Sequence, residues 1–192
     1  MISPRVTNRA VMRDVPREAD PELMRQLASG DVAALGELYD RHHEPVRRFV
    51  ARATSDAEDV DDLVQATFLA AAQTAARYDG RASCRPWLIG IAVHLLRRRR
   101  QAFGRFHAVL ASLTGRKAAS IDPRPALHAH YDVERALLQI SETKRITFLM
   151  VEVERLSCAE VAAMLRVPIG TVWTRLHAAR RELRRALEGE QS

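Results

Sequence analysis

Few side chains in this sequence are spaced for metal binding or covalent catalysis. His42 and His43 are adjacent, and neighbouring residues on a helix point about 100° apart, so they are poorly placed to share one ion. The two cysteines, Cys84 and Cys158, form no C-x-x-C pair, and the chain has no H-x-x-x-H pair. It also has no glycine-rich phosphate-binding loop and no nucleophile motif. We therefore expect no enzyme, no bound metal and no cofactor.

The strongest chemical signal is a basic helix near the C-terminus. Ser157 and Glu160 form an S-x-x-E capping box, which predicts the start of a short helix. Residues 166–169 interrupt this helix, and a longer one is predicted from Gly170. Helix, short turn and helix in this order are typical of the DNA-binding helix-turn-helix. The outward face of the second helix would enter the major groove with Trp173, Thr174, Arg175, His177, Arg180, Arg181 and Arg184.

The predicted turn carries one unusual residue. Many such turns have glycine where this chain has Arg166, because the backbone there is left-handed. Arg166 must therefore either bear a modest strain or sit in a different turn. An ordinary helical hairpin with a solvated basic face is the alternative that this pattern leaves open.

Charge is unevenly distributed along the chain, whose net charge is +6. Residues 22–62 carry ten acids against five arginines, whereas residues 63–100 carry seven arginines against one aspartate. Residues 166–185 carry six arginines against one glutamate. This distribution favours one surface for a cationic partner and others for a polyanion. Solvated helix faces in an arginine-rich chain would give the same counts.

Apolar residues recur with the helical period, and no stretch alternates with the period of a strand. The pattern predicts an all-α chain of two small helical domains joined by a flexible linker. We expect a flexible tail over residues 1–20, a first domain over 21–103, a linker over 104–130 that includes a helical start near 103–113, and a second domain over 131–192. Helices are predicted near residues 31–53, 57–76 and 83–100, with Pro45 kinking or dividing the first of them.

No apolar run approaches the roughly 18 residues that a membrane-spanning helix needs. The N-terminal residues also lack the apolar block of a signal peptide. With two cysteines and no disulfide framework, the expected location is the reducing cytoplasm, without direct membrane insertion.

Three stretches together resemble a known family. Residues 61–69 read DDLVQATFL, residues 85–92 read RPWLIGIA, and residues 170–180 read GTVWTRLHAAR. In this order and at these separations they are similar to motifs of bacterial RNA polymerase sigma factors of the extracytoplasmic-function (ECF) group. The resemblance covers about residues 23–103 and 131–187. It implies two helical domains, called region 2 and region 4, that bind core RNA polymerase and promoter DNA.

The resemblance also implies roles for residues of region 2. Its acidic helix would dock on the β′ coiled coil of core polymerase through Asp61, Asp62, Leu63 and Gln65. Glu58 and Asp59 need no partner, because the positive end of the helix dipole explains them. The melted −10 promoter element would be bound by Arg81, Ser83, Arg85, His94, Arg97, Arg98, Arg99 and Arg100. The family usually has asparagine where this chain has His94.

Region 4 would bind the β flap of polymerase and read the −35 promoter element. The implied DNA contacts are Thr171, Trp173, Thr174, Arg175, His177, Ala178 and Arg180. Trp173 and Ala178 differ from the arginine or lysine frequent in the family, and they cannot pair with guanine in a bidentate way. The resemblance further implies an anti-sigma factor as a regulatory partner.

A helix-turn-helix regulator that does not act as a sigma factor is the alternative. It would explain the C-terminal motif equally well. It would not explain the acidic helix followed by the W-L-x-x-I-A helix and four consecutive arginines.

Overall fold

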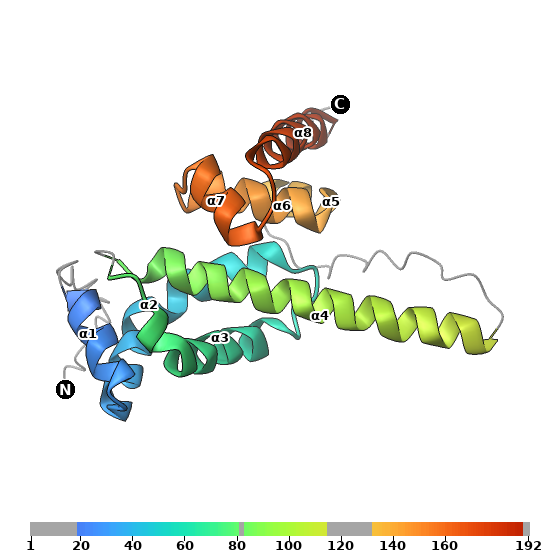
Figure 1. Cartoon of the computed structure of the whole chain (residues 1–192). Helices are drawn as coiled ribbons and strands as arrows, with labels where there is room; N and C mark the ends of the chain where they lie inside the picture. The colour runs from blue at the N-terminus through green and yellow to red at the C-terminus, as the bar shows by residue number, and fades with distance from the viewer. Residues whose placement is uncertain (1–18, 81–82, 115–131, 190–192) are drawn as a thin grey trace, which may run out of the picture.

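The computed structural model describes residues 19–80, 83–114 and 132–189, with side chains except those of residues 19, 106–114, 132 and 189. Every regular element within these ranges is helical (Figure 1). The first domain holds α1 (Ala19–Ala28), α2 (Val32–Ala53), α3 (Val60–Thr74), a 3-10 turn (Ala75–Arg77) and α4 (Arg85–Thr114). The second domain holds α5 (Asp132–Gln139), α6 (Glu142–Phe148), a π-helical turn (Leu149–Val153), α7 (Cys158–Leu165) and α8 (Ile169–Gly189).

The first domain packs α1, α3 and α4 around α2. Asp31 caps α2 by accepting a hydrogen bond from the Ala33 amide at 2.9 Å, as its sequence position predicts. The helix then runs unbroken through Pro45, so a division into two helices is wrong. Proline removes one backbone hydrogen bond. Val46, Phe49 and Val50, which follow it, are at most 2% exposed, and their burial favours a continuous helix.

The acidic helix begins three residues later than predicted, at Val60. Local side-chain hydrogen bonds hold the preceding residues in turns. The Thr54 hydroxyl accepts from the Asp56 amide at 3.1 Å, and the Asp56 carboxylate accepts from the Glu58 amide at 3.2 Å. Such bonds compete with helix formation, which explains the later start.

Helix α4 is longer than expected and passes the predicted boundary at residue 103. Residues 104–114 are helical where a linker was expected, and they continue the predicted helical start near 103–113 without a break. Gly104 inside the helix destabilises it by only about 1 kcal/mol relative to alanine, which does not end it. At the other end, α1 begins inside the predicted tail, at Ala19. Residues 1–18 and 115–130 lie outside the described part of the chain.

The second domain contains the predicted helix-turn-helix. Ser157 and Glu160 form the complete capping box at the start of α7. Arg166 ends α7 with φ 52° and ψ 51°, so it bears the left-handed strain that the sequence suggested. The buried stripe of α8, which includes Val172 and Ala179, packs on α5, α6 and α7. The second domain in turn lies against α2 and α4 of the first, with α7 over α4 (Figure 1).

Candidate nucleic-acid interface

The recognition helix α8 turns its predicted DNA-reading residues outward. Trp173 is 59% exposed, and Thr174 and His177 are exposed beside it. The Thr174 hydroxyl donates to the Gly170 carbonyl at 2.9 Å, which leaves its oxygen able to accept a hydrogen bond. Thr171, Arg175 and Ala178 are half-buried at the flanks. The first two turns of α8 thus offer an indole, a hydroxyl and an imidazole to a ligand.

Arg180, also on this face, is already paired. Its guanidinium contacts the Glu152 carboxylate, with a distance of 2.9 Å between Nε and Oε1. Glu152 lies in the π-helical turn of the same domain. Arg180 must share or exchange this partner in order to hold a phosphate.

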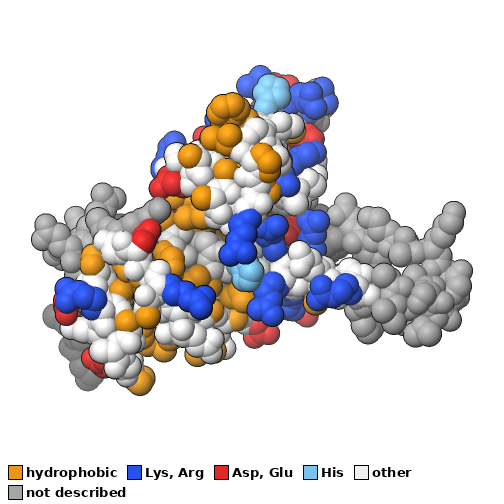
Figure 2. Space-filling model, viewed as in Figure 1, with side chains coloured by type: hydrophobic (Ala, Val, Ile, Leu, Met, Phe, Trp, Pro, Cys, Tyr) orange, Lys and Arg blue, Asp and Glu red, His pale blue; other side chains and the backbone are white. Residues whose placement is uncertain are grey.

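Helix α4 carries the residues predicted to bind the −10 element. Ser83 precedes it, and its hydroxyl accepts a hydrogen bond from the Arg85 amide at 3.4 Å. His94 and Arg97 to Arg100 are exposed along the helix. Arg81 lies outside the described residues. Figure 2 shows basic side chains gathered along α4 and on the outer end of α8.

Three of these α4 arginines contact protein groups. Arg85 holds the Glu154 carboxylate through two bonds, at 2.7 Å from Nε and 3.0 Å from the terminal nitrogen. Arg97 donates to the Leu165 carbonyl at 2.6 Å. Arg99 pairs with Asp59 at the start of α3. Burial raises the pKa of Asp59, and the charge of Arg99 opposes this shift.

The acidic start of α3 is split between surface and core. Asp61, Asp62 and Gln65 are exposed, and Asp61 forms an ion pair with Arg47 at 3.2 Å that is open to solvent. Leu63 is only 5% exposed and belongs to the core. Packing inside the first domain therefore uses the Leu63 side chain, and its contact with polymerase stays a prediction.

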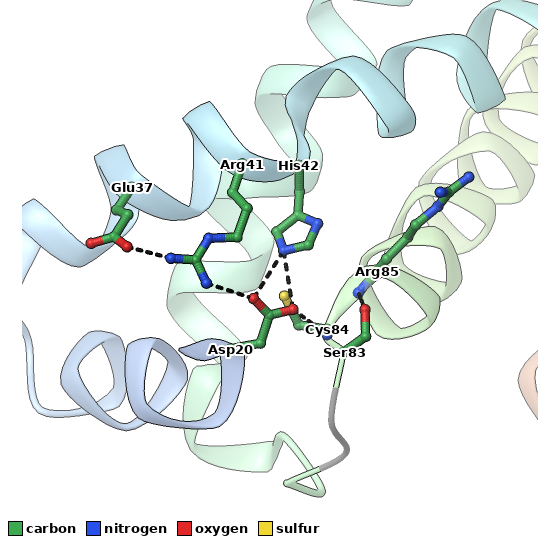
Figure 3. A network of polar contacts seen from close by, with 7 residues as sticks. All are labelled: Asp20, Glu37, Arg41, His42, Ser83, Cys84 and Arg85. Atoms are coloured by element: carbon green, nitrogen blue, oxygen red, sulfur yellow. Dashed lines mark hydrogen bonds and ion pairs between the residues drawn. The ribbon is translucent and has the colours of Figure 1, made fainter. Parts of the chain in front are cut away.

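Sequence reasoning missed a buried polar network that joins α1, α2 and the start of α4 (Figure 3). Asp20, 3% exposed, accepts from Arg41 at 2.9 Å and from the Cys84 amide at 2.9 Å, and its Oδ2 lies 3.1 Å from His42 Nε2. Burial alone would raise the pKa of Asp20, but the bonds from His42, the Cys84 amide and Arg41 outweigh it and hold that pKa below its ordinary value. Arg41 also pairs with Glu37.

This network contains side chains of metal-binding type. The ligand atoms of Asp20, His42 and Cys84 all lie within 4.8 Å of one another. Burial and the nearby Asp20 charge raise the pKa of the Cys84 thiol well above its ordinary value. The Asp20 carboxylate is already bonded by Arg41 and a backbone amide, so the network ties helices together without further ligands. The apolar period of α1, with Leu23 and Leu27, is the sequence signal that could have placed Asp20 in a packed helix.

Comparison with known proteins decides the family. The Sigma-70 region 2 model matches residues 38–105, and the Sigma-70, region 4 model matches residues 130–183. The ECF RNA polymerase sigma factor SigM of Mycobacterium tuberculosis is 31% identical over 172 residues, which are 88% of this chain and 85% of SigM. The chain belongs to the ECF sigma factors. In this sigma factor the first domain is region 2 and the second is region 4, as the motifs predicted.

Solved structures share the fold of this sigma factor. CnrH in complex with the cytosolic domain of CnrY matches with a TM-score of 0.60 and 25% identity, over 89% of this chain and 98% of that one. RpoE in complex with the anti-sigma factor NepR from Bartonella quintana matches with a TM-score of 0.64 and 22% identity, over 82% and 98%. The predicted fold class, all-α with two helical domains, is confirmed. In the described part of this sigma factor, no helix is long and apolar enough to cross a membrane.

Proposed function

We propose a division of labour within this sigma factor. Region 2 docks on core polymerase through α3 and captures the melted −10 element through α4. Region 4 reads the −35 element through α8 and contacts the β flap. The observation that carries this proposal is that one chain presents an acidic α3, a basic α4 and an outward-facing recognition helix. The role is one of binding and positioning, without catalysis by the chain itself, and we place it in the cytoplasm.

The docking surface on α3 is supported by charge and exposure. Asp61 and Asp62 lie in the first turn and face solvent, and Gln65 is exposed one turn later. The Arg47 partner of Asp61 is itself 51% exposed at its side chain, so this pair opens at little cost when a cationic surface approaches. Complementary charge of this kind speeds encounter and fixes register.

The side chains that are exposed in the first turns of α8 support its role in reading bases. A helix that enters the major groove meets base edges with its first turns, where Trp173, Thr174 and His177 are exposed. None of the three has the guanidinium fork that suits guanine, while Trp173 can contact a thymine methyl group. We therefore expect a −35 sequence that differs from those read by relatives with arginine at these positions.

An anti-sigma factor is the proposed regulator. The support is the RpoE structure, whose partner is described as an anti-sigma factor, together with the shared fold. A binding experiment with candidate proteins encoded beside this gene identifies the partner.

Association with core polymerase tests the proposal. The purified chain should comigrate with core RNA polymerase, and tight promoter binding should require the core enzyme. Replacing both Asp61 and Asp62 by arginine should abolish comigration without loss of helicity, because reversal of close charge pairs costs several kcal/mol. Glu58→Arg, one turn earlier and exposed, is the matched control and should leave comigration intact. A chain that bound duplex DNA alone and ignored core polymerase would instead be a helix-turn-helix regulator.

A further inference from the structure

A cavity of about 210 Å³ lies where the second domain meets α4. Helices α4, α6, α7 and α8 all contribute residues to its wall, so the cavity belongs to both region 2 and region 4. Figure 2 shows basic side chains gathered at this junction. The described residues that line the cavity are Arg97, Arg100, Gln101, Glu142, Thr143, Ile146, Leu165 and Arg175.

The wall of this cavity carries an excess of positive charge. Among the described residues that line it, three are arginines and Glu142 is the single acid. Arginine stays charged in proteins, so the three guanidinium groups cannot reduce their repulsion by releasing protons. Burial raises the pKa of Glu142, although the charges of Arg100 and Arg145 oppose this shift. Glu142 is therefore a weak counter-ion, and an anion in the cavity would offset the repulsion between the arginines.

The hydrogen-bond donors of the cavity suit phosphate oxygens. Arg97 donates from one terminal nitrogen to the last carbonyl of α7 at 2.6 Å, which leaves its other nitrogens for a ligand. No hydrogen bond or ion pair to another described residue engages the guanidinium of Arg100 or Arg175. Gln101 and Thr143 add an amide and a hydroxyl. Guanidinium groups bind phosphate oxygens through two parallel bonds, so this wall is suited to a phosphate ligand.

The size of the cavity and the position of its arginines restrict the ligand. Sites for drug-sized ligands span about 300–1,000 Å³, so a cavity of about 210 Å³ admits a small anion or only the phosphate end of a nucleotide. Arg97 and Arg100 lie one turn apart on α4, whereas Arg175 comes from α8. Two linked phosphate groups would engage both walls, with one group on the α4 pair and the other on Arg175.

We propose that this cavity binds a diphosphate group between region 2 and region 4, either as inorganic pyrophosphate or as the phosphate end of a nucleotide. This inference rests on the proposed function, because the same three arginines are predicted promoter contacts. A bound diphosphate occupies Arg97 and Arg100 of the −10 set and Arg175 of the −35 set. It therefore competes with DNA for both sets, and it makes promoter binding responsive to a small phosphorylated anion.

Isothermal titration of the free full-length chain with sodium pyrophosphate tests the site. The wild type should bind one equivalent, and Arg100→Gln and Arg175→Gln should each weaken binding about tenfold, because each removes charge-assisted bonds. The matched controls are Arg105→Gln and Arg185→Gln, which remove the same charge from exposed positions of α4 and α8 outside the cavity. They should change the Kd less than about twofold, since only screened charge is altered.

A gain of affinity separates this site from damage to the fold. Glu142→Gln removes the acid from the cavity wall and should tighten pyrophosphate binding about threefold or more, whereas a damaged fold would weaken it. The matched control is Glu188→Gln, which removes the same charge from an exposed position near the end of α8. This control should change the Kd less than about twofold.

Two further measurements identify the source of the diphosphate and its effect. Titration with ADP assigns the ligand to a nucleotide if ADP binds more tightly than pyrophosphate, and to the free anion if it binds more weakly; either result supports the site when Arg175→Gln abolishes the tighter binding. Saturating pyrophosphate should also weaken binding of a fluorescein-labelled single-stranded DNA 12-mer more than sodium sulfate of equal ionic strength does. Equal effects of the two salts would refute competition with DNA.

The inference is overturned if neither pyrophosphate nor ADP binds saturably, or if the Arg105→Gln and Arg185→Gln controls weaken binding as much as the cavity variants. Sensitivity to Arg100→Gln without sensitivity to Arg175→Gln would also overturn it, because a site between the two regions needs both. These results would leave the proposed function standing, because comigration with core polymerase is measured separately and depends on α3.

Discussion

Replacing Asp20 by asparagine tests the network that joins α1, α2 and the start of α4. Asparagine keeps a carbonyl oxygen for the Cys84 amide but leaves Arg41 without its buried counter-charge. The side chains of this pair are 5% and 12% exposed, and removal of one partner from a buried pair costs about 3–5 kcal/mol. Glu37 still contacts the second nitrogen of Arg41, so we expect the lower end, about 3 kcal/mol.

The stability that Asp20→Asn loses relative to the wild type should depend on pH in a defined direction. The folded-state pKa of Asp20 is lowered, so its stabilisation is fully present above the unfolded-state pKa of about 3.9. It is lost as pH falls from there toward the lower folded-state value. The difference in stability between wild type and Asp20→Asn should therefore be constant near neutral pH and shrink below about pH 4.

Urea unfolding followed by tryptophan fluorescence measures this difference. Trp87 packs edge-on against Tyr78 at 5.4 Å in region 2, whereas Trp173 is already exposed, so the change in signal reports mainly on region 2. Glu37→Gln is the control, because it removes the exposed carboxylate from the same guanidinium and should cost less than about 1 kcal/mol. A loss below about 1 kcal/mol for Asp20→Asn, or a difference in stability that does not shrink between pH 5 and about pH 2, would refute the reasoning.

Three further predictions concern α4 and the helix-turn-helix. Arg166→Gly should stabilise region 4 by up to about 1 kcal/mol in thermal unfolding, because glycine removes the left-handed strain but gains unfolded-state freedom; a lower melting temperature would contradict this. Arg175→Ala should weaken binding to all −35 variants alike, and it should lower by about one the slope of the logarithm of the binding constant against the logarithm of the salt concentration. His177→Ala should instead change the preference between −35 bases by about 1–3 kcal/mol, as measured with a randomised promoter library. Replacing residues 97–100 by glutamine should reduce permanganate reactivity over the −10 region. It should also make the dependence of the binding constant on salt concentration shallower by up to about three in the log–log slope. Permanganate footprints of normal strength would count against this prediction.

The helices could be predicted because their signals are local. The capping box at Ser157, the cap at Asp31 and the apolar stripe of α8 each depend on residues within a turn or two of one another. The ends of the helices were harder to predict from the sequence. Competing side-chain bonds delayed α3, and α4 runs past the predicted boundary at residue 103 because Gly104 does not end it.

The contacts between distant segments could not be predicted. Asp20 and the Cys84 amide are 64 residues apart, and Arg85 and Glu154 are 69 apart, so no periodicity links them. The burial of Leu63 illustrates a different point. A family motif mixes residues that face a partner with residues that hold the helix in place, and the apolar period of α3 already placed Leu63 on the buried stripe.

The distance along the chain between Asp20 and Cys84 has a consequence for synthesis. At about 5–20 residues per second, the ribosome needs roughly 3–13 s to make the 64 residues that separate them. During that interval Leu23, Met24 and Leu27, which are buried in the finished protein, lack the segment that anchors their helix. Helix α1 is therefore made before the other described helices of region 2, and it gains this anchor only when the start of α4 has been made.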